Sequence, residues 1–166
     1  MTTYNLNTSR NGNFTKTDNA LFLLYTRLPD FKADHAMLYT ILTHFHNAEY
    51  GYAFPTVWEL ALRLNCSTKK VSRMKSVLVK YGLVDIRQLP GRNNDVYYLK
   101  PPITDEVSFY AAHPEAREYY EKQLKASEAD RRRSADNLVS YRQEKVEKQP
   151  TFTYSDGESV PLVDVF

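Results

Sequence analysis

The segment from Phe54 to Lys100 changes its apolar spacing midway, and that change limits the folds that it can adopt. Up to Gly82 the apolar residues recur every three or four positions, as they do along one side of a helix. After Gly82 they alternate with polar residues, as in a strand with one buried face. The segment is therefore predicted to form helices and then strands.

The first predicted helix begins at Thr56. Thr56 and Glu59 have the T-x-x-E spacing of a capping box, in which each side chain satisfies an unpaired backbone N–H group at a helix start. The apolar residues that follow share one face of a helix, and they are Val57, Leu60, Ala61 and Leu64. This helix is expected to be short, about two and a half turns.

A second helix is predicted to begin at Ser67. Asn65 and Cys66 interrupt the helical period, and serine is a favourable N-cap residue. The second apolar face consists of Val71, Met74, Leu78 and Tyr81. Two helices joined by a tight polar turn form a helix-turn-helix, whose second helix can enter the major groove of DNA.

Two strands are predicted next, at residues 83–89 and 96–99. The residues between them, Pro-Gly-Arg-Asn-Asn-Asp, supply the backbone angles of a hairpin turn. A helix-turn-helix followed by a β-hairpin is a winged helix. The predicted fold class is therefore mainly α with a small β-hairpin wing (α+β), followed by a C-terminal helical extension.

Positive charge is concentrated in this segment. From Arg63 to Lys100 there are nine Lys and Arg residues and two Asp residues, a net charge of +7, whereas the whole chain carries +2. Such a concentration is typical of a surface that neutralises phosphates. Residues off the apolar stripe and on the hairpin are the predicted contacts to double-stranded DNA: Thr68, Lys69, Lys70, Ser72, Arg73, Ser76, Arg87, Arg92 and Asn93.

Arg73 is the preferred base reader among these residues, because a guanidinium group can bind guanine through two hydrogen bonds. The lysines are expected to position the DNA backbone, and Arg92 on the hairpin tip is expected to contact phosphate or the minor groove. The alternative is a solvated basic face on a winged helix that binds protein.

A family resemblance rests on two stretches. The sequence S-T-K-K-V-S-R-M-K-S-V-L-V-K-Y-G-L-V, at 67–84, resembles the recognition-helix-to-wing segment of bacterial winged-helix proteins, including MarR-like and GntR-like regulators. With F-P-T-V-W-E-L-A at 54–61, the region 28–86 is similar to the N-terminal domain of DnaD-type replication-initiation proteins and to winged-helix initiators of phages and plasmids.

The resemblance implies a role in starting DNA replication. The second DNA-binding domain of the DnaD family has no recognisable counterpart after Lys100. A transcriptional repressor that binds an operator as a dimer remains the alternative, because it uses the same helix-turn-helix. A homodimer is expected in either case, since one recognition helix reads few bases.

The sequence predicts four parts: a flexible arm at 1–19, the winged-helix domain at 20–102, a helical extension at 103–149 and an acidic, partly apolar tail at 150–166. The run at 20–28 is ambiguous between helix and strand, and 32–47 is predicted to be a scaffold helix. Thr104 is expected to cap a short helix, and Pro114 to open a long one. The tail either packs on the domain or docks a partner from the replication machinery.

Several other classes of function are not expected. No glycine-rich phosphate loop, metalloprotease motif or nucleophile elbow is present, so we expect neither an enzyme nor a cofactor. His44 and His46 point about 200° apart on a helix, so no metal site is predicted. The single cysteine, the absence of a long apolar run and the polar start favour a cytoplasmic protein that does not enter a membrane.

Binding of single-stranded nucleic acid is a further alternative. The chain has 13 tyrosines, and aromatic rings on a basic surface can stack on unpaired bases. Most of them are expected to be core or interface residues. Tyr97 and Tyr98 alternate between the two faces of the hairpin, so at most one of them can face a nucleic acid.

Overall fold

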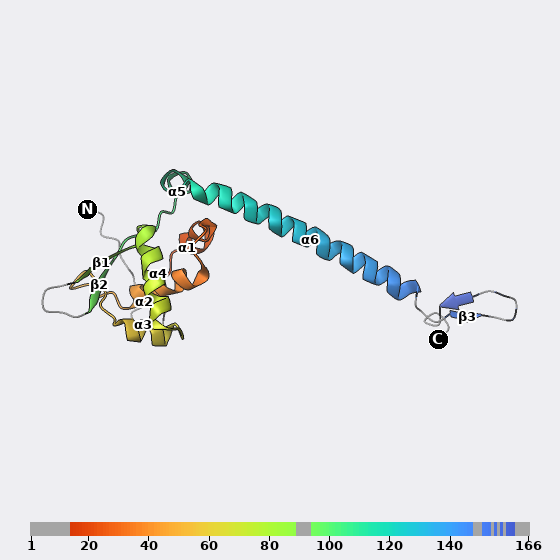
Figure 1. The fold of residues 1–166 in the computed structure, drawn as a ribbon, viewed down its shortest axis with the longest axis horizontal. Coiled ribbons are helices and arrows are strands. Elements are labelled where there is room, and N and C mark those ends of the chain that lie inside the picture. Colours follow the sequence, from red (N-terminus) through yellow and green to blue (C-terminus); the bar gives the residue numbers. More distant parts are fainter. Residues whose placement is uncertain are drawn as a thin grey trace. The chain divides into compact units, whose positions relative to one another are not determined.

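The structure is a computed structural model that describes residues 14–88, 94–147, 151–153, 155, 157 and 159–161. The chain divides into two compact units, Met1–Tyr120 and Glu121–Phe166. The first unit contains a winged helix (Figure 1), built from α2 (Ala33–His44), α3 (Val57–Arg63), α4 (Thr68–Lys80), β1 (Val84–Gln88) and β2 (Asp95–Leu99). The predicted α+β winged helix with a C-terminal helix is confirmed, whereas the proposed four-part division stays a prediction.

The helix-turn-helix begins at both predicted caps. The Thr56 hydroxyl accepts a hydrogen bond from the backbone N–H of Glu59 at 3.1 Å, and the Ser67 hydroxyl accepts one from the backbone N–H of Lys70 at 3.2 Å. Only half of the predicted capping box forms, because the Glu59 carboxylate pairs with Arg63, one turn further along α3.

The predicted apolar faces of α3 and α4 form the core of the first unit. Leu60, Val71 and Leu78 are fully buried, and Val57 and Leu64 pack against the core while half-exposed. These faces meet the buried side of α2, which presents Leu38 and Leu42. Burial of this kind fixes the outward side of α4, because a helix that buries one stripe exposes the opposite one.

The wing is an antiparallel hairpin with a short third segment at its edge. Val84 pairs with Leu99, and Gln88 pairs with Asp95 at the other end. Ala53, in the loop between α2 and α3, exchanges two backbone hydrogen bonds with Tyr97, at 2.9 and 2.8 Å. The loop therefore extends the wing beyond β2, which the sequence did not predict. Leu89 and the centre of the turn, 90–93, lie outside the described residues.

The ambiguous run at 20–28 is helical. It forms α1 (Ala20–Leu23) and the 3₁₀ turn η1 (Tyr25–Arg27), with Leu21, Tyr25 and Leu28 buried. A strand here would have placed alternate residues in water, and only the contacts with the rest of the unit distinguish the two cases.

Helix α5 (Glu106–Ala112) packs on this helical run. The prediction that Thr104 caps it was wrong by one residue, because the Asp105 carboxylate accepts the hydrogen bond from the backbone N–H of Ser108, at 2.8 Å. A carboxylate is also favoured at a helix start by the helix dipole. Phe109 is fully buried, and its ring centre lies 5.2 Å from that of Tyr25.

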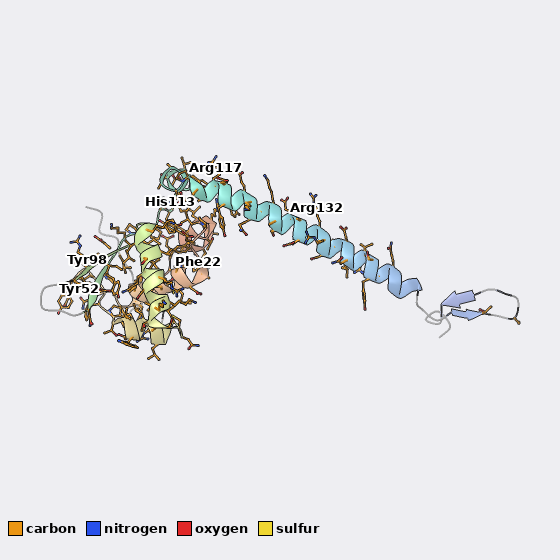
Figure 2. All side chains as sticks on the ribbon, viewed as in Figure 1. Phe22, Tyr52, Tyr98, His113, Arg117 and Arg132 are labelled. Carbon is orange, nitrogen blue, oxygen red and sulfur yellow. The ribbon has the colours of Figure 1, made fainter. Side chains whose placement is uncertain are left out.

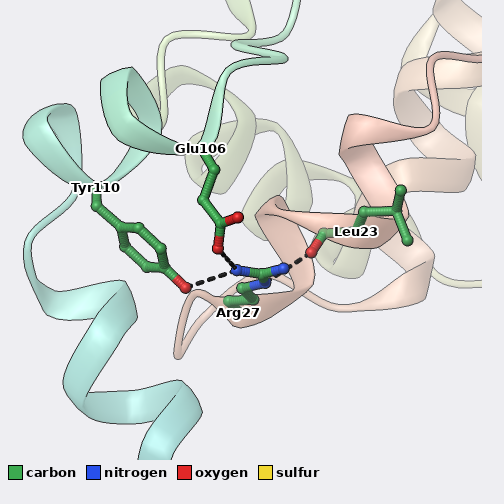
Figure 3. A network of polar contacts seen from close by, with 4 residues as sticks. All are labelled: Leu23, Arg27, Glu106 and Tyr110. Atoms are coloured by element: carbon green, nitrogen blue, oxygen red, sulfur yellow. Dashed lines mark hydrogen bonds and ion pairs between the residues drawn. The ribbon is translucent and has the colours of Figure 1, made fainter.

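A polar network around Arg27 also holds α5 to η1 (Figure 3). The Arg27 guanidinium donates hydrogen bonds to the Glu106 carboxylate and, at 2.7 Å, to the Tyr110 hydroxyl, while its Nε–H group donates to the carbonyl oxygen of Leu23 at 2.8 Å. Its guanidinium carbon lies 4.7 Å from the ring centre of Tyr120. Helix α5 is thus part of the winged-helix unit.

Helix α6 (Glu115–Glu147) begins directly after Pro114, as predicted. From Glu121 onward it belongs to the second unit, and every side chain from 121 to 143 is exposed. The second unit also contains β3 (Thr151–Thr153) and β4 (Ser159–Pro161), which pair antiparallel. The last apolar residues of the tail, 162–166, lie outside the described residues, so its packing or docking stays a prediction.

A buried histidine, His35, and a half-buried one, His113, make the stability of the fold sensitive to pH. Burial lowers the pKa of His35 and also that of His113, although the nearby acidic residues Asp34 and Glu115 oppose the effect. The Nδ1 atom of His35 accepts a hydrogen bond from the backbone N–H of Lys32 at 2.9 Å, which requires that Nδ1 carry no proton.

We expect the free energy of unfolding to fall as the pH is lowered from 7 to 5. The unfolded chain gains protons on these histidines near pH 6.5, before the folded chain does, so acid favours the unfolded state. Each histidine contributes at most about 1.4 kcal/mol per pH unit. Urea denaturation at several pH values measures the slope, and His113→Gln should reduce it. An unchanged slope in His113→Gln would mean that His113 does not contribute to the pH dependence.

Candidate nucleic-acid interface

Helix α4 presents one continuous polar stripe on the side opposite its buried face. Five exposed residues spaced by three or four positions make up this recognition stripe: Lys69, Ser72, Arg73, Ser76 and Lys80. Such spacing places side chains in a row along a helix. The stripe begins two residues after the Ser67 cap, in the half of the helix where contacts to base edges usually occur.

The cations of α4 differ in what they already bind. The ammonium groups of Lys70 and Lys80 pair with the carboxylates of Asp34 and Asp30, each at 2.5 Å. Hydrogen bonding to these carboxylates raises the pKa of Lys70 and of Lys80. Because both pairs are about half-exposed, their strength in water is small and phosphate can compete for the lysines.

Lys69 and Arg73 form no ion pair with any described residue, although both are exposed. Their charges are therefore available to an anion without breaking a contact within the described chain. They lie four positions apart and so occupy adjacent turns of the recognition stripe.

Lys75 does not contribute to this surface. It is buried, its ammonium group donates a hydrogen bond to the Asp95 carboxylate at 2.6 Å, and it lies 5.6 Å from the ring centre of Tyr97. The net charge of +7 counted along the sequence thus includes one cation, Lys75, that is buried and is not part of the exposed basic surface. Lys75 fastens α4 to β2 instead of facing solvent.

The hydroxyl groups near the stripe donate within the helix. Ser72 donates to the carbonyl oxygen of Thr68, and Ser76 donates to that of Ser72, both at 3.1 Å. A hydroxyl whose proton is used in this way still has lone pairs that accept hydrogen bonds. Ser72 and Ser76 are exposed, so they can accept from the amino groups of bases, and Thr68 is half-buried.

Arg87 is the only predicted wing contact that the structure describes. Its exposed guanidinium carbon lies 5.0 Å from the ring centre of Tyr98 and its side chain pairs with Asp85 at 3.1 Å. The predicted contacts Arg92 and Asn93 lie outside the described residues. The predicted contacts that the structure describes lie in two places. Arg87 lies on the wing, and the others lie on α4, where Thr68 and Lys70 are off the recognition stripe and Lys69, Ser72, Arg73 and Ser76 are part of it.

Sequence reasoning missed an apolar feature beside the recognition stripe. Trp58 and Leu62 on α3 are 75% and 82% exposed. They line a shallow depression that continues to Ser67 and Thr68 at the start of α4. Their spacing of four residues, off the buried face of α3, was the available signal, because large apolar side chains seldom stand together in water without a role.

The described residues include no group of three or more His, Cys, Asp or Glu side chains suited to holding a metal ion. Within the same described ranges, no helix has the length and apolar character needed to cross a membrane.

Comparisons with other proteins give little further information. No protein-family model matches the chain, and no curated protein matches it. One solved structure, titled "Structure of MDR initiator", is similar at 26% identity, over 61% of this chain and 88% of that one, with a TM-score of 0.40. A TM-score of this size does not establish a shared fold.

Proposed function

We propose that this protein binds double-stranded DNA by placing α4 in the major groove, and that it acts by binding and not by catalysis. The supporting observation is the recognition stripe, in which Lys69 and Arg73 are exposed and without an ion pair in the described chain.

Within this proposal the residues divide by chemistry. Lys69 binds phosphate, and Lys70 and Lys80 do so after exchanging their aspartates for phosphate. Arg73 reads a base edge, because its planar group binds guanine through two hydrogen bonds whereas an ammonium group cannot. Ser72 and Ser76 add hydroxyl acceptors along the same groove.

The biological process we propose is initiation of DNA replication, on the strength of the sequence resemblance of region 28–86 to winged-helix initiators. Binding as a homodimer, which would let two copies of α4 read two half-sites, belongs to the same proposal. Repression of transcription is the other process that this surface would serve. The position of the bound sequence distinguishes the two, since an initiator binds an origin and a repressor binds a promoter.

We expect Lys69→Ala/Arg73→Ala to weaken binding to duplex DNA and to flatten its dependence on salt. Each lost phosphate contact reduces the magnitude of the negative slope of log K against log salt concentration by about 0.9. Fluorescence anisotropy on a site selected from random duplexes measures both quantities. Exposed Trp58, beside the start of α4, provides a second signal, because its emission should change when DNA docks there.

The matched control is Lys125→Ala/Arg142→Ala, which removes the same charge from exposed positions of α6. An equal loss in the control would mean that net charge, and not α4, governs binding. Arg73→Lys separates base reading from attraction: it should reduce discrimination at one or two base pairs by about 1–3 kcal/mol and leave binding to random DNA unchanged.

A further inference from the structure

The outer face of the wing gathers aromatic rings from two separate segments. Ala53 pairs with Tyr97, so its neighbours Tyr52 and Phe54 point to the face opposite Tyr97. Tyr98 points to that same outer face, because it follows Tyr97 on β2. Tyr97 is buried against the core, and the outer face is therefore the one directed away from α4 and the core.

The rings on this face form a continuous aromatic row, which comprises Tyr50, Tyr52, Phe54 and Tyr98. The ring centres of Tyr52 and Tyr98 are 5.4 Å apart (Figure 2), and Tyr50 stacks on Tyr52 at 5.8 Å with an angle of 22° between the planes. Phe54 lies beside this pair, with its ring centre 6.1 Å from that of Tyr52 and 6.2 Å from that of Tyr50. Tyr50 is 54% exposed and Phe54 is 40% exposed.

One cation lies at the end of the row. The guanidinium carbon of Arg87 is 5.0 Å from the ring centre of Tyr98. Arg87 also pairs with Asp85, which points to the same face of β1. Both of these side chains are exposed, so their pair is weak and screened by salt, and a phosphate group can take the place of the carboxylate.

Packing alone does not explain this row. Rings that serve only the core are covered, as Tyr97 is, whereas about half of the Tyr50 surface remains in water. Adjacent rings that are at least partly exposed, beside a guanidinium group, match the chemistry of unpaired nucleotides, whose bases have flat faces and whose backbone is anionic. Bases within a duplex are stacked on one another and cannot offer their faces to such rings.

We propose that the aromatic row and Arg87 form a binding site for single-stranded DNA, in which unpaired bases stack on the exposed rings and Arg87 contacts a phosphate. This site is separate from the recognition stripe, because the wing packs on α4 through its opposite face. It adds a second ligand to the proposed function and does not depend on it. One chain then holds duplex and unpaired strand on two different surfaces.

The test uses fluorescence anisotropy of the full-length protein with two labelled 12-nucleotide strands. One is oligothymidine, and the other is an abasic strand with the same phosphates and no bases. We expect oligothymidine to bind about tenfold more tightly than the abasic strand. Tyr50→Leu and Tyr98→Leu, which keep apolar bulk but lose the aromatic face, should each weaken oligothymidine binding about tenfold. Neither should change binding to a duplex.

Tyr141→Leu is the matched control, because Tyr141 is a similarly exposed tyrosine (59%) on α6. It should bind oligothymidine as the unchanged protein does. Tyr50 is an exposed loop residue, so Tyr50→Leu should keep the circular dichroism melting curve and remain informative if Tyr98→Leu does not fold.

Equal binding of the two strands would overturn the proposal, as would an equal loss in Tyr141→Leu. A matching loss of duplex binding in Tyr50→Leu would also overturn it, because the row would then belong to the duplex interface. Lys69→Ala/Arg73→Ala separates the two proposals. If that variant loses duplex binding and keeps oligothymidine binding, both stand; if the unchanged protein binds oligothymidine but no duplex, only the duplex proposal fails.

Discussion

Phe109→Ala should lower the free energy of unfolding of the first unit by about 3–5 kcal/mol, the largest effect that we expect of a single change. The Phe109 ring is fully buried between two others, with its centre 5.2 Å from that of Tyr25 and 5.1 Å from that of His113. Truncation would remove its apolar contacts and leave a cavity between α5 and η1. Urea denaturation followed by circular dichroism measures the loss.

Val107→Ala is the matched control on the same helix. Val107 is 79% exposed, so its truncation should change the free energy of unfolding by no more than about 0.5 kcal/mol. A loss below about 1 kcal/mol for Phe109→Ala would mean that α5 contributes little to the stability of the winged-helix unit. The network of Arg27, Glu106 and Tyr110 would then be a surface contact only.

Asp95→Ala should cost about 3 kcal/mol, because it leaves the ammonium group of Lys75 without its partner in a site that water barely reaches. The Lys75 side chain is 11% exposed and the Asp95 side chain is 25% exposed, with 2.6 Å between the bonded atoms. Removal of one member of a buried pair costs more than the pair contributes, since the remaining charge stays desolvated. The loss should appear in the same urea denaturation experiment.

The double variant Lys75→Met/Asp95→Ala distinguishes this explanation from a loss of packing. It removes both charges, and methionine has a length similar to that of lysine, so the double variant should lose much less free energy of unfolding than Asp95→Ala, because no charge is left desolvated and the methionine fills the same space beside Tyr97. Asp85→Ala is the control at the wing surface, where its pair with Arg87 is exposed and should contribute less than about 1 kcal/mol. An equal cost for Asp85→Ala and Asp95→Ala would contradict the role of burial.

Most of the winged helix could be predicted from local sequence. The caps at Thr56 and Ser67 and the apolar periods of α3 and α4 depend on residues within a few positions of one another. The same periods determine which residues of α4 point outward, so the sequence alone assigns Lys69 and Arg73 to the recognition stripe.

The roles of the remaining charges could not be predicted in this way. Lys75 and Lys80 are two basic residues of one helix, yet one is buried against β2 and the other pairs at the surface with Asp30. The aspartates that distinguish them lie 20 and 50 positions away in the sequence. A count of charges along the chain therefore treats as equal two lysines that the fold separates.

The sequence by itself determined that this chain forms a helix-turn-helix with a hairpin wing, and which face of α4 is polar, because periodicity and capping are local properties. Only the tertiary structure decided that Tyr50, Tyr52 and Tyr98 stand in one row. The pairing of Ala53 with Tyr97 joins segments more than 40 residues apart, which no local pattern records. The proposed duplex surface thus follows from one helix, whereas the proposed single-strand surface exists only where two distant segments meet.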